Sequence, residues 1–351
     1  MSRAAADFAS RLRSATAVAC VGETMAMLTP HTEGSLEFGQ DLSLSIGGAE
    51  SNVAMYLADY GLPARWISRV GDDALGRMVV NRIASGGVDV SAVEVDPARP
   101  TGVYFKEPGP SGTRVYYYRR GSAATALTPT VLSNKAIATA DVLHITGITP
   151  ALSDSCREFI EAAVFGDLPN DQLLSFDVNW RPSLWKDDGP ETLLRFARAA
   201  DLVFVGADEA RTLWGCTSPQ DLRSLLPEPT VLVVKDGEVG ATLMVGHESL
   251  FVGALTVDVV EVVGAGDAFA AGFIAGMLQG LDWSRQVRLG HLTAAAALRV
   301  RGDHGPVLPA NDRLRLLAAT EEEWAHARIS EATQSVPRPS SGPGVVHVPN
   351  S

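Results

Sequence analysis

A carboxylate that directly follows a turn of small residues is the first feature of this sequence with evident chemistry. In the stretch VVGAGDAFAAGF, residues 262–273, Gly264, Ala265 and Gly266 lead into a helical pattern, and Asp267 comes next. Small residues leave main-chain N–H groups uncovered, and a helix N-terminus carries partial positive charge, so the turn predicts an anion site. Aspartate is also a common helix cap, so the turn alone leaves a structural role for Asp267 open.

The chemical interpretation of this turn is phosphoryl transfer. During its transfer, a phosphoryl group carries charge on its equatorial oxygens, to which N–H groups can donate hydrogen bonds. The attacking hydroxyl arrives from the opposite side and needs a proton acceptor. Asp267, one residue beyond the anion site, can serve as that acceptor. The chain contains no Gly-Lys pair, so the turn is not a Walker A loop.

The segment GGAESN offers a site for the hydroxyl groups of an acceptor. Gly47 and Gly48 permit close approach to the main chain, and Asn52 carries both a donor and an acceptor. A plain turn, with the Asn52 side chain bonded to its own backbone, is the alternative.

Two arginine-bearing segments suggest that the acceptor is itself an anion. In VYYYRRGSAAT, residues 115–125, strand alternation places Tyr117 and Arg119 on one face. In DVNWRPSLW, Arg181 precedes a proline, which favours an extended conformation that can reach into a site. Arginine binds a carboxylate through two parallel hydrogen bonds, so the two segments together predict a carboxylate clamp. Taken singly, each arginine is as well explained as a solvated surface residue.

The rest of the chain alternates short β-branched runs with amphipathic helical patterns, which predicts an α/β fold. We expect a mostly parallel, doubly wound sheet with helices on both faces and ligands beyond the carboxyl ends of its strands. The expected strands cover residues 64–70, 141–147, 173–179, 201–206 and 230–237. The expected helices include residues 74–85, 153–165 and 191–200.

Two segments without helices, about 25–46 and 101–120, predict a small β-rich lid over the sheet. A hairpin tip without function is the alternative for the second of them. The two ends of the chain, residues 1–12 and 328–351, are expected to be flexible because the tail is rich in proline, serine and glycine.

Composition excludes several classes of protein. The 351 residues are 46% hydrophobic and 20% charged, as in globular proteins with a sizeable core. No apolar run approaches the roughly 20 residues that span a bilayer. The segment ATAVACVG, residues 15–22, indicates a buried strand rather than a signal peptide. We therefore expect no membrane partner and a cytoplasmic location. Three widely spaced cysteines predict reduced thiols. The net charge of −12 argues against nucleic acid and requires local cations for any anionic substrate.

The motifs also carry a family resemblance. GAGDAF resembles the C-terminal signature of the ribokinase-like (PfkB) carbohydrate kinases, and residues 46–76 are similar to the N-terminal signature of the same family. This resemblance implies a ribokinase-like fold and a single kinase domain over residues 17–320, with Asp267 as the catalytic base, Gly264, Ala265 and Gly266 as the anion hole, and the 47–52 loop as the sugar site. Glu261 stands where the family usually has aspartate, near a possible monovalent-cation site.

The resemblance extends to the nucleotide side and implies ATP and Mg²⁺. VVKDGEVGA is similar to the family's nucleotide-binding turn, which implies that Lys235, Gly237 and Gly240 contact ATP; a surface hairpin is the alternative. VGADEAR matches the family's Asn-x-x-Glu motif with Gly206 in place of asparagine, so Glu209 is implied to act on Mg²⁺ through water, with no direct protein ligand. His291 stands where asparagine is common beside adenine.

YYYRRGSA and DVNWRPSLW resemble the corresponding segments of 2-keto-3-deoxygluconate kinases. The resemblance implies that Tyr104, Tyr117, Arg119 and Arg181 bind the sugar acid and that Asp267 deprotonates its C6 hydroxyl. It also implies a homo-oligomer, a dimer formed through the lid. A fructokinase or other neutral-sugar kinase is the nearest alternative, and a non-catalytic regulator on the same fold is another. A dinucleotide oxidoreductase is disfavoured because no Gly-x-Gly-x-x-Gly turn follows the first strand.

Overall fold

The computed structural model describes residues 17–31, 36–37, 39–109, 113–166, 168–169 and 172–329. The segment 1–12, expected to be flexible, and nearly all of 328–351 therefore lie outside the described residues. Residues 328 and 329 are described, and they correct the expectation for the start of the tail. They form a short strand, β16 (Arg328–Ile329), that pairs in parallel with β15 (Thr256–Val257).

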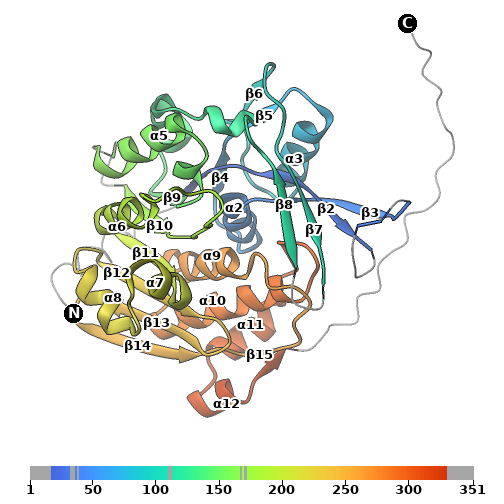
Figure 1. Ribbon diagram of the computed structural model, residues 1–351. Helices are drawn as coiled ribbons and strands as arrows, with labels where there is room; N and C mark the ends of the chain where they lie inside the picture. Colours follow the sequence, from blue (N-terminus) through green and yellow to red (C-terminus); the bar gives the residue numbers. More distant parts are fainter. Residues whose placement is uncertain are drawn as a thin grey trace, which may run out of the picture.

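An eight-stranded sheet forms the centre of the molecule (Figure 1). Its order is β14-β13-β12-β11-β10-β9-β1-β4, with neighbours parallel from β4 to β12 and antiparallel from β12 to β14. Most of these strands are apolar runs buried on both faces, as parallel sheets require. The strands are β1 (Val18–Val21), β4 (Ala64–Ile67), β9 (Val142–Thr146), β10 (Leu173–Asp177), β11 (Leu202–Gly206), β12 (Val231–Asp236), β13 (Gly240–Val245) and β14 (Glu248–Gly253).

Helices cover both faces of this sheet, as the sequence predicts. Alternate strand residues point into two separate hydrophobic cores, one on each face. One core is completed by α2 (Ala49–Asp59), α3 (Ala74–Ser85), α9 (Ala265–Leu278), α10 (Trp283–Leu298), α11 (Ala310–Leu317) and α12 (Glu321–Ala325). The other is completed by α4 (Lys135–Ala138), α5 (Asp154–Phe165), α6 (Gly189–Ala199), α7 (Ala207–Trp214) and α8 (Pro219–Leu225). Three 3₁₀ turns, η1 (Ala123–Ala126), η2 (Pro129–Ser133) and η3 (Thr149–Ala151), lie in the connections.

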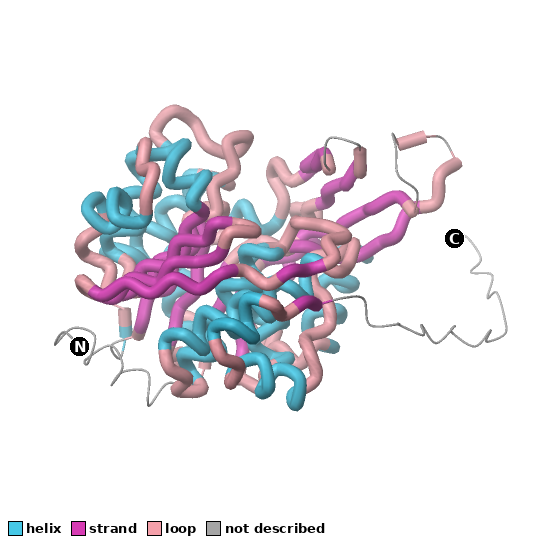
Figure 2. The backbone as a smooth tube through the Cα atoms, turned by 90° about the horizontal axis from the view of Figure 1, so that it is seen from below, coloured by secondary structure: helices cyan, strands magenta, loops and turns pink. Residues whose placement is uncertain are grey.

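A second sheet projects from the body beside the carboxyl ends of the central strands (Figure 2). Its order is β3-β2-β7-β8, formed by β3 (Leu42–Gly47), β2 (Met25–Pro30), β7 (Val103–Glu107) and β8 (Arg114–Tyr118). These strands fall within the two segments for which the sequence predicts a lid. Within the described residues, β3 and β8 pair on one side only, and Tyr116, Tyr117 and Tyr118 are exposed on β8. Dimer formation through this sheet stays a prediction.

The expected strand over residues 64–70 is divided in the structure. β4 ends at Ile67, and the chain then leaves the central sheet to form β5 (Arg69–Gly71), which pairs with β6 (Glu94–Asp96). Among the described residues, no helix has the length and apolarity to cross a membrane.

The core that positions the site depends on α9, which is buried almost all round between the sheet, α2 and α10. Phe273 on α9 is 1% exposed and meets Phe204 of β11 edge to face, with ring centroids 5.5 Å apart. We expect Phe273→Ala to lower the free energy of unfolding by about 3–5 kcal/mol, because the cavity adds to the lost transfer energy. Urea denaturation measures this loss. Phe251→Ala is the matched control, since Phe251 is 57% exposed, and an equal loss in both variants would contradict the packing argument.

Candidate active site

The glycine-rich turn forms the N-terminus of α9. Gly264 is its N-cap at φ 87°, and a Cβ there would lie 2.8 Å from the carbonyl oxygen of Asp303, so both the conformation and the space call for glycine. The hydrogen bonds of α9 begin with the N–H of Ala268, which donates to the Gly264 carbonyl at 2.9 Å. The N–H groups of Gly266 and Asp267 come before this bond, in the part of a helix where N–H groups have no partner within the helix. These amides and the helix dipole suit an anion at this point.

Asp267 is held by two amide side chains from distant parts of the chain. Asn52 Nδ2 on α2 donates to Asp267 Oδ2, and Asn179 Nδ2, after β10, donates to Asp267 Oδ1, each at 3.0 Å. The Oδ1 atoms of both asparagines are buried without a hydrogen-bond partner. A ligand hydroxyl could satisfy them, so the three side chains form a polar cup beside the anion site.

The environment of Asp267 makes it a suitable base near neutral pH. Loss of solvation raises the pKa of its carboxyl from 3.8 to about 6. The hydrogen bond from Asn52 lowers the pKa, the nearby Asp177 charge raises it, and Arg181 and Lys235 lower it. The net shift places the carboxylate where it is ionised at pH 7 and basic enough to accept a proton.

The loop over residues 47–52, expected to bind the sugar, lies against the second sheet. A Cβ on Gly47 would collide with the hydroxyl of Tyr104 and lie 2.6 Å from Asp303 Oδ2, which explains the glycine. Tyr104 is buried and donates from its hydroxyl to Asp303 Oδ2 at 3.2 Å. Gly48 is the N-cap of α2, which brings Asn52 to Asp267. The structure thus brings together Gly47, Gly48, Asn52 and Tyr104.

Tyr117 and Arg119 share a face, as strand alternation predicts. The Tyr104 and Tyr117 ring centroids are 5.7 Å apart, and the Arg119 guanidinium lies 5.7 Å from the Tyr117 centroid. Arg119 is not a free cation, however. Its Nε donates to Glu23 Oε2 at 2.6 Å, and its Nη2 pairs with the same oxygen. The sequence analysis did not anticipate this buried partner, and a ligand carboxylate would meet Arg119 alongside Glu23.

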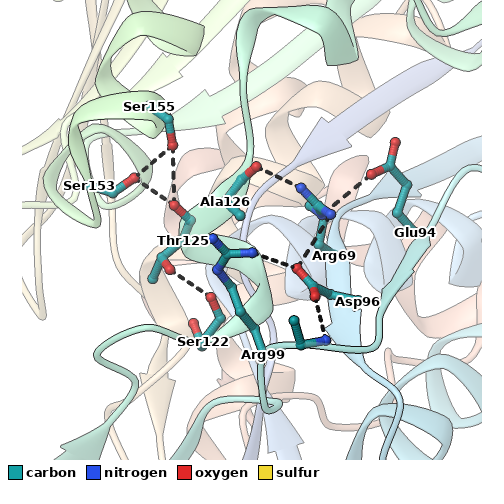
Figure 3. A network of polar contacts seen from close by, with 10 residues as sticks. Arg69, Glu94, Asp96, Arg99, Ser122, Thr125, Ala126, Ser153 and Ser155 are labelled. Atoms are coloured by element: carbon teal, nitrogen blue, oxygen red, sulfur yellow. Dashed lines mark hydrogen bonds and ion pairs between the residues drawn. The ribbon is translucent and has the colours of Figure 1, made fainter.

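A polar network fixes the segment that follows Arg119 (Figure 3). Ser122 donates from its hydroxyl to Glu23 Oε1, and the Thr125 hydroxyl donates to the Ser122 carbonyl at 2.6 Å. Arg69 Nη1 donates to the Ala126 carbonyl at 2.9 Å. Further bonds tie this segment to α5 and β6, through Ser153, Ser155, Glu94, Asp96 and Arg99. The network thereby holds Glu23 and Arg119 in place.

Arg181 follows Asn179 and Trp180 in the loop after β10. Its side chain is exposed, Nη1 donates to the carbonyl of Trp180 at 3.0 Å, and its charge lowers the pKa of Asp267. Among the described residues, Arg181 has no carboxylate partner, and its charge acts on Asp267.

On the other side of the anion turn, Lys235 meets two acids. Its Nζ lies 2.7 Å from Asp177 Oδ2, and a Cβ on Gly266 would lie 3.4 Å from Nζ. Burial alone would lower the lysine pKa, but the Asp177 and Glu209 carboxylates raise it above its usual value. Asp177 Oδ1 is buried without a hydrogen-bond partner, so this corner can accept a cation or a water ligand.

Glu209 belongs to the same corner, although both of its oxygens are occupied. Oε1 accepts from the Trp180 N–H at 2.7 Å, and Oε2 accepts from the Gly206 N–H at 2.8 Å. Burial raises the pKa of Glu209, with Asp177 adding to the effect. Gly206, in the asparagine position, begins α7 and uses its main-chain N–H to hold the glutamate. The role of Glu209 toward Mg²⁺ stays a prediction.

The turn from 237 to 239 joins β12 to β13, with Gly237 at φ 47° and Gly240 as the first residue of β13. His291, expected beside the nucleotide, is largely buried in the structure. It is 7% exposed, its Nε2 lies 3.1 Å from the Val252 carbonyl, and it packs edge to face on Phe269. Burial lowers its pKa to about 4, so the ring is neutral. His291 is thus part of the core, and its contact with the nucleotide stays a prediction.

Glu261, in the family's aspartate position, turns toward the second sheet. Its Oε1 accepts from the N–H of Val262 at 2.9 Å, and its Oε2 accepts from the Thr113 hydroxyl at 3.0 Å. This carboxylate links the loop before the anion turn to the β7–β8 hairpin. A monovalent-cation site here stays a prediction.

Sequence reasoning missed several charged and polar residues of the site: Glu23, Glu50, Lys106, Asp177, Asn179 and Asp303. Glu50 accepts hydroxyl bonds from Thr146 and Thr149, and burial raises its pKa to about 7. Asp177 and Asn179 belong to the DVNWRPSLW stretch, so their place at a strand end was a usable signal. A lysine inside a strand pattern gave no signal for Lys106, which is fully buried with its Nζ 2.8 Å from Asp303 Oδ1.

A buried carboxylate at a glycine-led helix N-terminus, at the carboxyl edge of a doubly wound sheet and beside a small second sheet, is an arrangement suited to a small-molecule kinase. Comparison with known proteins gives the family: residues 15–311 match the pfkB family carbohydrate kinase model, and the chain belongs to this family. It is a carbohydrate kinase with a ribokinase-like fold, as the sequence predicts.

Similar proteins cover most of the chain. The 2-dehydro-3-deoxygluconokinase of Bacillus subtilis (strain 168) is 37% identical over 84% of this chain and 92% of its own length. The 2-dehydro-3-deoxygluconokinase of Thermoproteus tenax is 36% identical over 85% of this chain and 93% of its own length. The crystal structure of a PfkB protein from Polaromonas sp. JS666 has a TM-score of 0.76 at 32% identity, covering 87% of this chain and all of that one.

The buried Lys106–Asp303 pair provides a test of how the site is held together. We expect Lys106→Met to lower the free energy of unfolding by about 3–5 kcal/mol, because it leaves the Asp303 carboxylate buried without its partner. Arg285→Met is the matched control: the Arg285–Asp282 pair is about half exposed, and its loss should cost less than about 1 kcal/mol. Chemical denaturation of both variants decides the point, and equal losses would mean that Asp303 finds solvent or another donor.

Proposed function

We propose that this protein transfers the γ-phosphoryl group of ATP to the C6 hydroxyl of 2-keto-3-deoxygluconate, also called 2-dehydro-3-deoxygluconate. The observation that carries the proposal is the position of Asp267, one residue past the anion turn and bonded to Asn52 and Asn179. The names of the two relatives from B. subtilis and T. tenax support this acceptor.

Asp267 serves the receiving end of the transfer. The acceptor hydroxyl gives its proton to the Asp267 carboxylate as its oxygen forms a bond to the γ-phosphorus, and the bond from that phosphorus to the bridging oxygen breaks, so that ADP leaves with the electron pair. The unpartnered Oδ1 atoms of Asn52 and Asn179 are suited to accept bonds from neighbouring sugar hydroxyls. The proton leaves Asp267 to water after the phosphorylated sugar is released.

The anion turn and Lys235 serve the phosphate end. Gly264, Ala265 and Gly266 present the helix N-terminus, and Lys235 stands beside Gly266 as a fixed positive charge. Bound Mg²⁺ would neutralise phosphate charge. The unpartnered Asp177 Oδ1 and the nearby Glu209 fit such a cation through its water ligands. A Cβ on Gly237 would meet nothing within 4 Å, so this glycine leaves the β12–β13 turn open to the nucleotide, whereas Gly240 packs against the Val252 carbonyl of β14.

An acceptor carboxylate would be held by the two arginines. Arg181 is an exposed cation without a carboxylate partner in the described part of the chain, whereas Arg119, Lys235 and Lys106 are each paired with an acid. We therefore assign the larger share of carboxylate recognition to Arg181. Tyr117 and Arg119 provide a preformed second contact.

The base role of Asp267 predicts a pH profile. Its pKa is raised to about 6, so the protonated, inactive form prevails below pH 6 and the ionised, active form above it. We expect kcat/KM to rise about tenfold per pH unit below pH 6 and to level off above it. Asp267→Asn should lower kcat by about 10²–10⁴ with ATP binding retained. A coupled assay of ADP release measures the rates; turnover near the wild-type level in Asp267→Asn would refute the role.

The carboxylate clamp predicts a change in acceptor preference. Arg181→Ala should lower kcat/KM for 2-keto-3-deoxygluconate by about 10–100-fold, as expected for a lost hydrogen bond to a charged group. Activity on 3-deoxyfructose, which has a hydroxymethyl group in place of the carboxylate, should change little.

Arg120→Ala is the matched control, since Arg120 is an exposed arginine in the turn after β8. Equal losses on both acceptors would contradict the clamp. Higher wild-type activity on fructose than on the sugar acid would favour a neutral-sugar kinase, and comparison with 2-keto-3-deoxygalactonate would establish the preferred configuration.

A further inference from the structure

The chain continues past residue 311, where the family match ends, into a segment that packs back on the nucleotide half. We call residues 320–329 the C-terminal strap; it comprises α12, a turn and β16. Thr320 caps α12 by accepting from the N–H of Glu323, so the strap has a defined start. In Figure 1, α12 lies below α10 and α11, and β15 lies beside it.

Trp324 is the anchor of the strap. It is 4% exposed, and its Nε1 donates to the Gly253 carbonyl at 2.9 Å. Gly253 is the last residue of β14 and pairs with Gly240 of β13, the end of the proposed nucleotide turn. The indole therefore holds the strand that backs this turn.

Arg288 on α10 secures the other side of the indole. Its guanidinium lies 4.9 Å from the Trp324 ring centroid, and its Nη1 donates to the carbonyls of Leu317 and Ala319. His291, one turn further along α10, has its ring centroid 6.3 Å from that of Trp324. The strap thus packs against the buried face of α10 that carries Arg288 and His291.

The end of the strap holds the segment that leads to the anion turn. β16 pairs with β15, the Asp258 N–H donates to the Ile329 carbonyl at 3.4 Å, and Arg328 Nη2 lies 2.6 Å from Asp258 Oδ1. Immediately afterwards, the N–H of Val260 donates to the Leu298 carbonyl of α10 at 2.7 Å. Along the chain toward Gly264, residues 256–258 are therefore held by the strap, and Val260 is held by α10.

We propose that the C-terminal strap is a positioning segment for the nucleotide: it holds the β13–β14 end and residues 256–258, and so sets ATP affinity without contributing to the acceptor side. The proposal rests on the proposed function, because it assigns the 237–240 turn to ATP. The hydrogen bonds and ion pair of the strap run to Gly253, Thr256, Val257 and Asp258, away from Asn52 and Asn179, so we expect its effects to be confined to one substrate.

Trp324→Phe tests the anchor, because phenylalanine keeps an aromatic ring but leaves the Gly253 carbonyl without its donor. We expect KM for ATP to rise about threefold to tenfold, as for one lost hydrogen bond at a buried group, with KM for the sugar acid unchanged. Arg328→Ala removes an exposed pair and should raise KM for ATP by about twofold or threefold. Arg285→Ala, which breaks the exposed Arg285–Asp282 pair on α10, is the matched control and should leave both constants unchanged.

Calorimetric titration with a non-hydrolysable ATP analogue separates this proposal from the proposed function. If the wild-type protein binds no analogue, the proposed function itself fails. If the wild type binds and Trp324→Phe binds equally well while its melting temperature falls, the strap only stabilises the fold and the proposal is wrong. A parallel rise in KM for both substrates would also overturn it, since it would indicate a general loosening of the site.

Discussion

The site depends on one carboxylate kept partly away from water. Asp267, the proposed base, is surrounded by two amide donors and the N-terminus of α9 in place of solvent; these groups orient the carboxylate, and the loss of water raises its pKa to about 6. Each donor comes from a different part of the chain, Asn52 from α2 and Asn179 from the end of β10. The central sheet brings these parts together, so the fold sets the basicity of this group as much as its position.

The cations of the site show how an acidic protein can bind anions. With a net charge of −12, the chain offers no long-range attraction for ATP or a sugar acid. Arg119, Lys106 and Lys235 are instead each held by an acid at short range, with Glu23, Asp303 and Asp177 as partners. Such pairs cost desolvation when the chain folds, but they leave the cations oriented before a ligand arrives. Arg181, exposed and unpaired with any acid in the described residues, is the group best able to respond to ligand charge.

The local part of this arrangement could be predicted from the sequence. The glycine-led start of α9, the Gly47–Gly48 loop with Asn52, and the shared face of Tyr117 and Arg119 all follow from spacing over a few residues, and the alternation of strands and helices gave the doubly wound sheet. The partners of these residues could not be predicted in the same way. Glu23 and Arg119 are 96 residues apart, and Lys106 and Asp303 are 197 apart, so only the folded chain shows that they meet.

Two placements that spacing along the chain could not reveal have a common physical origin, because each concerns backbone that needed a partner. The Nε2 of His291 lies by the Val252 carbonyl inside the core, where a neutral imidazole is easily buried. Residues 328 and 329 were expected to belong to a flexible tail, but β15 is a two-residue strand outside the central sheet, and β16 satisfies its hydrogen bonds. The composition shows a tail rich in proline and serine. It could not reveal that β15, about 70 residues earlier in the chain, would pair with the first residues of that tail. The need of backbone groups for hydrogen-bond partners depends on the fold. It decides which residues next to a sequence motif become ordered parts of the structure.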